Sequence, residues 1–272
     1  MYNKHESSLP ALPACAVTIA GSDSAGGAGI QADLKTFTRW QVFGASVLTA
    51  VTAQNTLGVT GVQALDPELI TAQLDAVLAD LPVSAAKTGM LANADIVAVV
   101  ADGLERQQFP LVVDPVMVAT SGARLLDREA EQAVVERLLP IATLVTPNQP
   151  EAAVLTGLET QSPPERLAEA LLKLGCQAAL VTGGHGDGSR VVDILADASG
   201  VRRIEHPRLA HRIHGTGCTL SAAITAALAR GLPLAEAIKA AEDWLARLLA
   251  HLKRPSTGPL ALIPFESGPS PV

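Results

Sequence analysis

The stretch His-Gly-Thr-Gly-Cys-Thr-Leu-Ser-Ala-Ala, residues 214–223, is the most informative part of this chain. Two glycines and a threonine precede an apolar, alanine-rich run, which predicts a helix over about 217–230. The first N–H groups of a helix have no partner within it, and the helix dipole adds partial positive charge there. Glycines let an anionic oxygen approach this backbone closely. The stretch therefore fits either an anion site or a helix start in which the glycines serve close packing.

Cys218 stands at the same predicted helix start, where the dipole favours the thiolate form of a cysteine. The plainer interpretation is a small buried thiol that fills space. A thiol hydrolase would need a histidine partner, and His185, His211 and His214 are the candidates. No local signature of such an enzyme surrounds Cys218. The residues alone leave the role of the thiol open.

Outward from this stretch, short apolar runs alternate with longer amphipathic ones. The short runs predict strands, and the longer ones predict helices with one apolar face. Alternation of this density predicts an α/β fold, with a central, mostly parallel sheet and helices on both faces. The predicted strands are 16–20, 46–54, 59–65, 85–88, 111–114, 144–146 and 178–182, with a hairpin of 191–195 and 200–206, and the predicted helices are 30–40, 67–81, 94–106, 165–174, 217–230 and 234–252.

The length of 272 residues fits one large domain or two small ones, and a hydrophobic content of 48% supplies a substantial core. Both ends of the chain are rich in proline, serine and glycine. We therefore expect a flexible N-terminal segment over 1–13, a single domain over 14–254, and a loosely ordered C-terminal tail over 255–272.

Charge and composition exclude several classes of partner. The net charge is −7 and no run of lysine or arginine occurs, which argues against nucleic acid. No apolar run is long enough to cross a membrane, and residues 1–13 do not have the pattern of a secretory signal. The three cysteines form neither a disulfide framework nor a Cys-x-x-Cys metal site. We expect a soluble, cytoplasmic protein with no membrane or nucleic-acid partner.

Several polar residues follow predicted strands, and ligands of such sheets bind outside the carboxyl ends of the strands. Asp23, Asp114, Asn148 and residues 183–184 can therefore converge on one cleft. Asp114 is suited either to hold Mg²⁺ through water or to cap a turn. Asn148 and Glu151 stand three apart at a helix start, a spacing that fits a shared functional face or a capping box.

Two glycine-containing loops allow close backbone contact with a ligand. Residues 21–33 lie between a predicted strand and helix, and suit a phosphate, a flat small molecule or a tight turn. Their spacing fits neither the P-loop nor a convincing Gly-x-Gly-x-x-Gly pattern. Residues 181–185, Val-Thr-Gly-Gly-His, end a strand with glycines across which a nucleotide could lie, with His185 near phosphate or in solvent.

Taken together, six ordered motifs resemble the hydroxymethylpyrimidine/phosphomethylpyrimidine kinases of thiamin biosynthesis, within the ribokinase-like superfamily. The resemblance runs from about residue 16 to 249 and implies the three-layer ribokinase-like fold. The motifs are Gly-Gly-Ala-Gly-Ile-Gln-Ala-Asp-Leu-Lys-Thr (26–36), Ala-Gln-Asn-Thr (53–56), Lys-Thr-Gly-Met-Leu (87–91), Asp-Pro-Val-Met (114–117), Thr-Pro-Asn (146–148) and the opening stretch (214–223).

The resemblance implies an enzyme, an ATP-dependent phosphotransferase. Its reaction moves the γ-phosphoryl group of MgATP to the hydroxymethyl oxygen of 4-amino-5-hydroxymethyl-2-methylpyrimidine, and a second one to the resulting monophosphate. It also implies Mg²⁺ and a homodimer, with a monovalent cation as a further candidate. The alternatives are a pyridoxal or pyridoxine kinase of the same superfamily and, from a different class, a non-catalytic pyrimidine-binding sensor.

The resemblance assigns roles by family position. Gly215, Thr216 and Gly217 would form the anion hole, and Cys218 would be the base where sugar kinases carry an aspartate. The amide of Gln54 offers a donor and an acceptor to an aminopyrimidine edge. The remaining residues are Gly21, Ala28, Asp33 and Met90 for the substrate, Asn148, Thr182, Gly184 and Lys87 for the nucleotide, and Asp114 and Glu151 for Mg²⁺ through water.

Two departures from the family pattern stand out. Thr182 occupies a position where many relatives have a lysine before Gly-Gly-His, so one phosphate-facing cation is missing. The C-terminal Gly-Pro…His-Phe pattern is reduced to Gly258-Pro259 and Phe265, which puts the closing contacts there in doubt.

Overall fold

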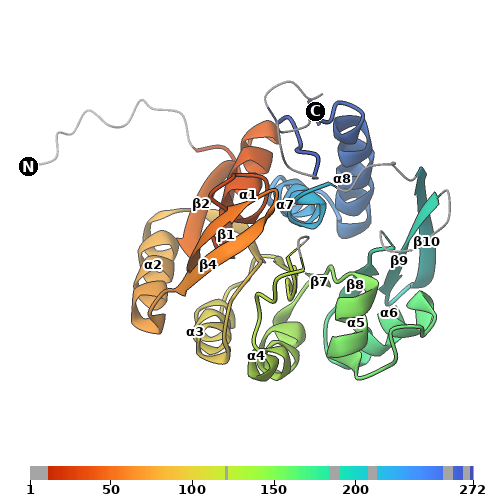
Figure 1. The fold of residues 1–272 in the computed structure, drawn as a ribbon, viewed down its shortest axis with the longest axis horizontal. Helices are drawn as coiled ribbons and strands as arrows, with labels where there is room; N and C mark the ends of the chain where they lie inside the picture. The colour runs from red at the N-terminus through yellow and green to blue at the C-terminus, as the bar shows by residue number, and fades with distance from the viewer. Residues whose placement is uncertain are drawn as a thin grey trace, which may run out of the picture.

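A sheet of eight strands forms the centre of this computed structural model, which describes residues 12–119, 122–183, 190–207, 213–253, 260–265 and 270–271 (Figure 1). The order is β10-β9-β8-β7-β6-β5-β1-β2. Neighbours from β2 to β8 are parallel, and β9 and β10 form an antiparallel hairpin at the edge. The strands are β1 (Cys15–Ala20), β2 (Phe43–Leu48), β5 (Val83–Thr88), β6 (Leu111–Val113), β7 (Leu144–Val145), β8 (Ala178–Val181), β9 (Arg190–Asp197) and β10 (Gly200–Pro207).

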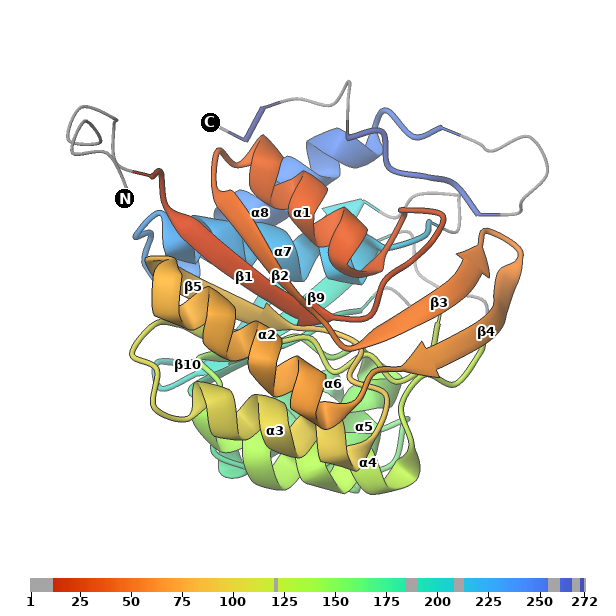
Figure 2. The same cartoon turned by 90° about the vertical axis from the view of Figure 1, so that its left-hand side faces the viewer.

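Helices cover both faces of the sheet, so the predicted three-layer α/β arrangement is confirmed (Figure 2). One face carries α1 (Gly29–Arg39), α7 (Thr216–Ala229) and α8 (Leu234–Leu249). The other carries α2 (Pro67–Asp80), α3 (Ala94–Leu104), α4 (Arg128–Ala133), α5 (Gln149–Thr156) and α6 (Pro164–Lys173), with the short turns η2 (Val134–Leu138) and η3 (Leu139–Ile141) after α4.

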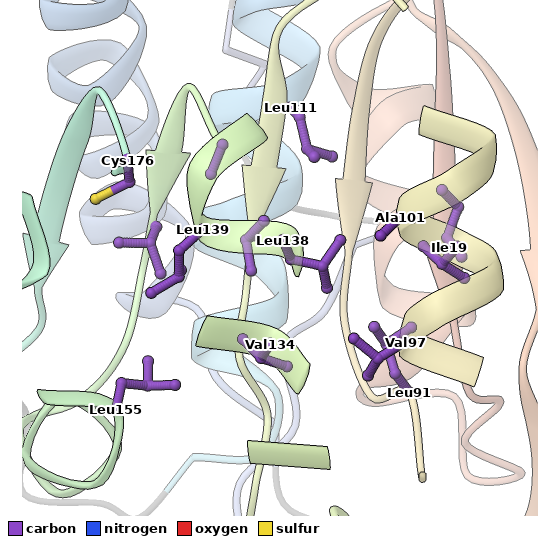
Figure 3. Packing of buried hydrophobic residues seen from close by; sticks show 14 of the residues in the cluster. Ile19, Leu91, Val97, Ala101, Leu111, Val134, Leu138, Leu139, Leu155 and Cys176 are labelled. Carbon is purple, nitrogen blue, oxygen red and sulfur yellow. The ribbon is translucent and has the colours of Figure 1, made fainter. Parts of the chain in front are cut away.

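Each face of the sheet packs its own hydrophobic core, because successive side chains of a strand point to opposite faces. Along β6, Leu111 and Val113 belong to the core under α2 to α6, whereas Val112 belongs to the core under α1, α7 and α8. Figure 3 shows part of the first core, where Leu138 and Leu139 lie among side chains from the strands. These paired cores explain why the central strands are apolar throughout rather than alternating.

The order in which strands are added to the sheet reverses at β1, and this reversal creates the opening in which a ligand can bind. From β1 the chain passes through α1 to β2 on one side, and later returns to β5 on the other side of β1. The connections therefore leave β1 and β5 in opposite directions, and a crevice forms outside their carboxyl ends. The loops after these two strands, 21–28 and 89–93, lie at that crevice.

The predicted strand 46–54 is two strands that belong to different sheets. β2 ends at Leu48, and Thr49 is fully buried where the chain leaves the main sheet. The Thr49 hydroxyl donates to the carbonyl of Met90, and its N–H donates to the carbonyl of Ala20. Beyond it, β3 (Ala50–Asn55) and β4 (Gly58–Ala64) form a separate antiparallel pair that projects from the main sheet (Figure 2).

Two further expectations differ from the structure. Residues 128–141 were not predicted to be helical, although Ala130, Val134 and Leu138 recur at helical spacing and are buried. The expected loose tail over 255–272 is wrong for residues 260–265, because Ile263 and Phe265 are buried in the core under α7 and α8. Within the described ranges, no helix is long and apolar enough to cross a membrane.

The core position of the unpredicted segment can be tested at Leu139, whose side chain is completely buried. Leu139→Ala should lower the free energy of unfolding by about 2–5 kcal/mol, because it removes packing atoms and leaves a cavity. Leu69→Ala on α2 is the matched control, since Leu69 is 52% exposed and its truncation should cost within about 0.5 kcal/mol. Urea denaturation measures both variants, and equal losses would contradict this packing.

Candidate active site

One cleft of about 970 Å³ lies at the carboxyl ends of the parallel strands. Its volume is at the upper end of the range for small-molecule sites. Every described residue of the predicted set lines it. These residues are Gly21, Ala28, Asp33, Gln54, Lys87, Met90, Asp114, Asn148, Glu151, Thr182, Gly215, Thr216, Gly217 and Cys218. Gly184 and His185 lie outside the described residues, so their predicted roles stay predictions.

The N-terminus of α7 opens into this cleft without a side-chain cap. Gly215 is the N-cap residue and has a φ of +79°, which favours glycine. A Cβ at Gly215 would lie 1.8 Å from the carbonyl oxygen of Gly27, so a glycine is also required by space. Thr216 and Gly217 follow on the cleft surface, and the first turn of the helix contains no acidic residue. This end of α7 is therefore suited to bind an anion.

Asp23 holds the glycine-rich loop 21–29 in place against α7. Its carboxylate accepts hydrogen bonds from the N–H groups of Ala25 (2.9 Å), Gly27 (3.0 Å) and Ala28 (2.8 Å). The same carboxylate lies 2.8 Å from Nε2 of His214, which therefore donates to it. Burial acts to raise the pKa of Asp23, but His214 and the backbone donors outweigh it and hold that pKa below its usual value. The loop and the anion site are thus built as one unit.

A buried ion pair lies beneath the cleft. Nζ of Lys87 donates to both carboxylate oxygens of Asp33 at 2.9 Å, and the hydroxyl of Thr18 donates to the same carboxylate at 2.6 Å. Both charged side chains are 0% exposed. Burial would lower the pKa of Lys87, but the negative charges of Asp33 and then of Asp114 raise it. Lys87 therefore stays protonated and places a positive charge under the site.

Two of the predicted contacts concern side chains that are buried in the unliganded protein, although both line the cleft, so these contacts stay predictions. We expected Lys87 to contact the nucleotide and Asp33 to contact the substrate. Neither side chain has an exposed surface, and their polar atoms bind each other and Thr18. In the unliganded protein, the pair can act on a ligand through its charge and by shaping the floor of the cleft.

Two buried carboxylates form the part of the wall that suits a cation. Asp114 follows β6 and accepts a hydrogen bond from the hydroxyl of Ser221 at 2.9 Å. Glu151 accepts from the N–H of Asn148 at 2.9 Å, and Asn148 caps α5 in return, so the capping box foreseen at this spacing is present. Burial and then the charge of Asp114 raise the pKa of Glu151 to about 8. Two mutually repelling oxygen ligands fit Mg²⁺, which would relieve this repulsion.

The thiol of Cys218 is not the thiolate that the helix dipole alone predicted. Burial and then the charge of Asp114 raise its pKa to about 12, against the smaller opposite effect of Lys87. The partial charge at a helix N-terminus is small beside a full negative charge in the same buried site. In the unliganded protein, Cys218 is therefore a neutral thiol at neutral pH.

Gln54 lies opposite α7, on the β3–β4 pair. Two hydrogen bonds to Ser24 fix the backbone of Gln54. The Gln54 N–H donates to the Ser24 hydroxyl, and that hydroxyl donates to the Gln54 carbonyl. The side-chain amide lies 3.4 Å from Nε2 of His214 and 3.3 Å from the hydroxyl of Thr52. The amide is thus placed at the end of the cleft formed by Gly21 and Met90, whose backbones are hydrogen-bonded to each other.

Sequence reasoning missed three residues that organise this site. Asp23 was noted only as a strand-end residue, although an aspartate before a glycine-rich turn is a recurrent way to bind loop N–H groups. His214 and Ser221 stand within the opening motif, and Ser221 is three residues after Cys218, on the same side of α7. Their partners, Asp23 and Asp114, are 191 and 107 residues away, so no local pattern indicates the pairing.

The arrangement suits phosphoryl transfer. The N–H groups at the start of α7 and the charge of Lys87 are both available to one phosphoryl group in the cleft. Built on a three-layer fold with this strand order, this arrangement defines a small-molecule kinase of the ribokinase-like class.

Comparison with known proteins identifies the family within this class. A family model described as Phosphomethylpyrimidine kinase matches residues 23–260. The hydroxymethylpyrimidine/phosphomethylpyrimidine kinase of Rhizobium meliloti is 50% identical over 251 residues, which cover 91% of this chain and 94% of the relative. The Escherichia coli protein of the same name is 45% identical over 241 residues, covering 87% and 91%. The chain therefore belongs to the phosphomethylpyrimidine kinase family.

Solved structures agree on the fold. Phosphomethylpyrimidine kinase from Clostridium difficile is 40% identical, with a TM-score of 0.77 over 87% of this chain and 100% of that one. An ADP complex of Bacillus subtilis pyridoxal kinase is 37% identical, with a TM-score of 0.84 over 92% and 96%. The fold is thus shared by kinases named for two different compounds, phosphomethylpyrimidine and pyridoxal.

The pKa of Cys218 predicts slow alkylation of this thiol. With a pKa near 12, iodoacetamide should modify Cys218 at pH 8 about a thousandfold more slowly than it modifies a free cysteine, because only the thiolate reacts. The rate should rise about tenfold per pH unit up to pH 10. Peptide mass spectrometry separates Cys218 from Cys15 and Cys176, and N-acetylcysteine is the reference. A rate that is already constant near pH 7 would restore the thiolate predicted from the sequence.

Proposed function

We propose that this protein is an ATP-dependent kinase that phosphorylates 4-amino-5-hydroxymethyl-2-methylpyrimidine to its monophosphate and then to its diphosphate, in thiamin biosynthesis. The observation that carries the proposal is the uncapped N-terminus of α7, which lines one cleft together with Gln54 and the buried Lys87. Membership of the phosphomethylpyrimidine kinase family supports the substrate class.

The backbone of α7 would hold the phosphoryl group during transfer. In the reaction a bond forms between the hydroxymethyl oxygen and the γ-phosphorus, the bond from phosphorus to ADP breaks, and the hydroxyl proton is lost. The N–H groups at Gly215, Thr216 and Gly217 would bind the phosphoryl oxygens, with Lys87 adding positive charge from below. Gly215 lets these donors approach the loop closely, because any side chain there would clash with the carbonyl oxygen of Gly27.

Cys218 would first lose its own proton to water in the cleft and would then, as a thiolate, accept the hydroxyl proton, which restores the thiol. Asp114 is the second cause of its raised pKa, so neutralisation of Asp114 would bring the thiol closer to ionisation. A divalent cation held through water by Asp114 and Glu151 would supply that neutralisation and would also offset phosphate charge. A loose transition state needs little base assistance early, so a late proton transfer to Cys218 suffices.

The pyrimidine and the nucleotide would occupy different parts of the cleft. Gln54 would bind the aminopyrimidine edge as donor and acceptor, with Gly21, Ala28 and Met90 forming the walls. On the other side, Thr182 is paired with Asn148 by a parallel bridge, and the nucleotide phosphates would lie against them and Gly184. Among the described lining residues Lys87 is the one lysine, so Thr182 does leave this side without a lysine of its own.

The wider biology of the chain is also a proposal. We place one kinase domain over 14–254, and we expect a cytoplasmic homodimer that uses Mg²⁺ and, as a further candidate, a monovalent cation. The dimer has one physical argument in its favour. Val51, Leu57 and Val62 on the projecting β3–β4 pair are 46%, 63% and 47% exposed, which gives this hairpin an apolar surface that a second copy could cover.

Product analysis tests the proposed function. The protein is incubated with MgATP and hydroxymethylpyrimidine, and we expect both the monophosphate and the diphosphate to appear, with stoichiometric ADP. The same coupled assay with pyridoxal tests the second candidate, which is favoured by the likeness to Bacillus subtilis pyridoxal kinase. Faster turnover of pyridoxal would replace the first proposal with the second. Tight pyrimidine binding without ATP consumption would indicate a sensor.

Two substitutions should separate chemistry from binding. Cys218→Ala should lower kcat about 100-fold or more with little change in KM for the pyrimidine, because a general base acts in the transition state. Gln54→Ala should raise KM about tenfold, because it removes hydrogen bonds made equally in both states. Gln63→Ala on β4 is the control, since Gln63 is exposed and does not line the cleft. An unchanged kcat in Cys218→Ala would end the base assignment and leave the anion hole intact.

A further inference from the structure

Three ionisable side chains gather on the cleft wall at a place that the proposed reaction does not use. Asp193 comes from β9, His206 from β10 and Glu242 from α8, and all three line the cleft. They offer one ligand atom each, and the three atoms lie within 4.8 Å of one another. The cluster joins the edge hairpin of the sheet to the last long helix. We call it the edge cluster.

Two of the three separations in the edge cluster are close to those of a tetrahedral metal site, and the third is within 4.8 Å. Nε2 of His206 lies 3.5 Å from a carboxylate oxygen of Asp193 and 3.7 Å from Oε1 of Glu242. Metal–ligand bonds of 2.0–2.2 Å at tetrahedral angles put neighbouring ligand atoms about 3.4 Å apart. Both distances are longer than an ordinary hydrogen bond, and an ion between the three atoms would need only small shifts of the side chains.

Burial leaves one oxygen of the edge cluster without a hydrogen-bond partner. The side chains of Asp193 and Glu242 are 7% and 4% exposed. Oε1 of Glu242 is buried and has no hydrogen-bond partner, although a buried carboxylate oxygen without one is costly. The other oxygen of Asp193 accepts the N–H of Gly183 at 2.7 Å, which orients this carboxylate as a supporting hydrogen bond does in metal sites.

The charge of the edge cluster also favours a cation. The two carboxylates face one imidazole, and Asp243 on α8 adds to the negative charge near Glu242. Asp193 and then Glu242 raise the pKa of His206 to about 10, so a proton occupies the site when nothing else does. A metal ion that displaces this proton would bring two positive charges where the proton brings one.

We propose that Asp193, His206 and Glu242 form a binding site for a divalent first-row transition-metal ion, for which Zn²⁺ is the best match. One imidazole with two carboxylates is a ligand set of Zn²⁺ sites, whereas Mg²⁺ prefers six oxygen ligands. Three protein ligands leave a fourth position, which faces the cleft because all three residues line it. The site is separate from the Asp114–Glu151 pair, since it uses neither of those residues.

The competing interpretation is an ion triad with no metal. In it, protonated His206 fastens β10 to α8 by attraction to both carboxylates, and the cluster serves stability alone. This arrangement explains the charge of the histidine, but it leaves Oε1 of Glu242 with an ion pair at 3.7 Å and no hydrogen bond. The two interpretations differ in what happens when a metal ion is added.

Cobalt titration of the whole protein decides between them. Co²⁺ replaces Zn²⁺ in such sites and reports four-coordinate geometry through its visible absorption, and an excess of Mg²⁺ keeps the oxygen-only sites filled. We expect one Co²⁺ per chain, with an intense four-coordinate spectrum that Zn²⁺ abolishes. No sulfur-to-cobalt charge-transfer band should appear, because none of the three ligands is a cysteine.

Substitutions assign the signal to these residues. Glu242→Gln and His206→Gln should each weaken Co²⁺ binding at least about tenfold, because each removes a ligand. Glu236→Gln on α8 and His251→Gln are the controls, since both residues are exposed, and they should bind Co²⁺ as the wild type does. Circular dichroism checks that each variant is folded.

Equal binding by the wild type and the two ligand variants would overturn the proposal, as would a weak six-coordinate spectrum or a thiolate band in the wild type. Should a variant fail to fold, the wild-type spectrum and stoichiometry decide alone. The readout needs neither pyrimidine nor ATP, so its result is independent of the proposed kinase activity.

Discussion

The carboxylate of Asp23 is the contact on which the site depends. It gathers three backbone N–H groups of the glycine-rich loop and the imidazole of His214, and so ties the end of β1 to the residue just before α7. The loop that Asp23 holds lies against Gly215, where an added Cβ would be 1.8 Å from the Gly27 carbonyl oxygen. A buried carboxylate with four donors is strongly held, since leaving any of them unpaired would cost free energy. The direction of the first N–H groups of α7 follows from that anchor.

Charge balance is the second constraint. Lys87 is the one lysine among the described residues that line the cleft, and the carboxylates of Asp33 and Asp114 act on its charge. Asp33 neutralises it, and burial with too little counter-charge raises the pKa values of Asp114 and Glu151. Burial and then the charge of Asp114 keep the Cys218 thiol protonated. An unliganded site with an excess of negative charge is suited to receive cations together with its phosphates, rather than phosphates alone.

Much of the fold could be predicted from local pattern, and the exceptions have identifiable causes. Strands such as 111–114 and the helices over 217–230 and 234–252 were found within a few residues, because burial on both sheet faces leaves continuous apolar runs. The break at Thr49 was missed, because its cause is a hydrogen bond to Met90, 41 residues away. Residues 260–265 resembled a tail, and they are held by the core under α7 and α8 rather than by their own pattern.

The sequence by itself determined the class of fold through its periodicity, and the common edge where parallel strands end placed Asp23, Asp114 and Asn148 in one cleft. The other site residues were assigned by resemblance to the family, and the described ones line the same cleft. Only the tertiary structure decided what those residues can do there. Lys87 and Asp33 form a buried ion pair under the cleft, and burial with the charge of Asp114 keeps Cys218 a neutral thiol, where the helix dipole alone favoured a thiolate. The edge cluster likewise joins residues from three separate elements. Protonation and charge depend on burial and on neighbours far away in the chain, and no local pattern contains that information.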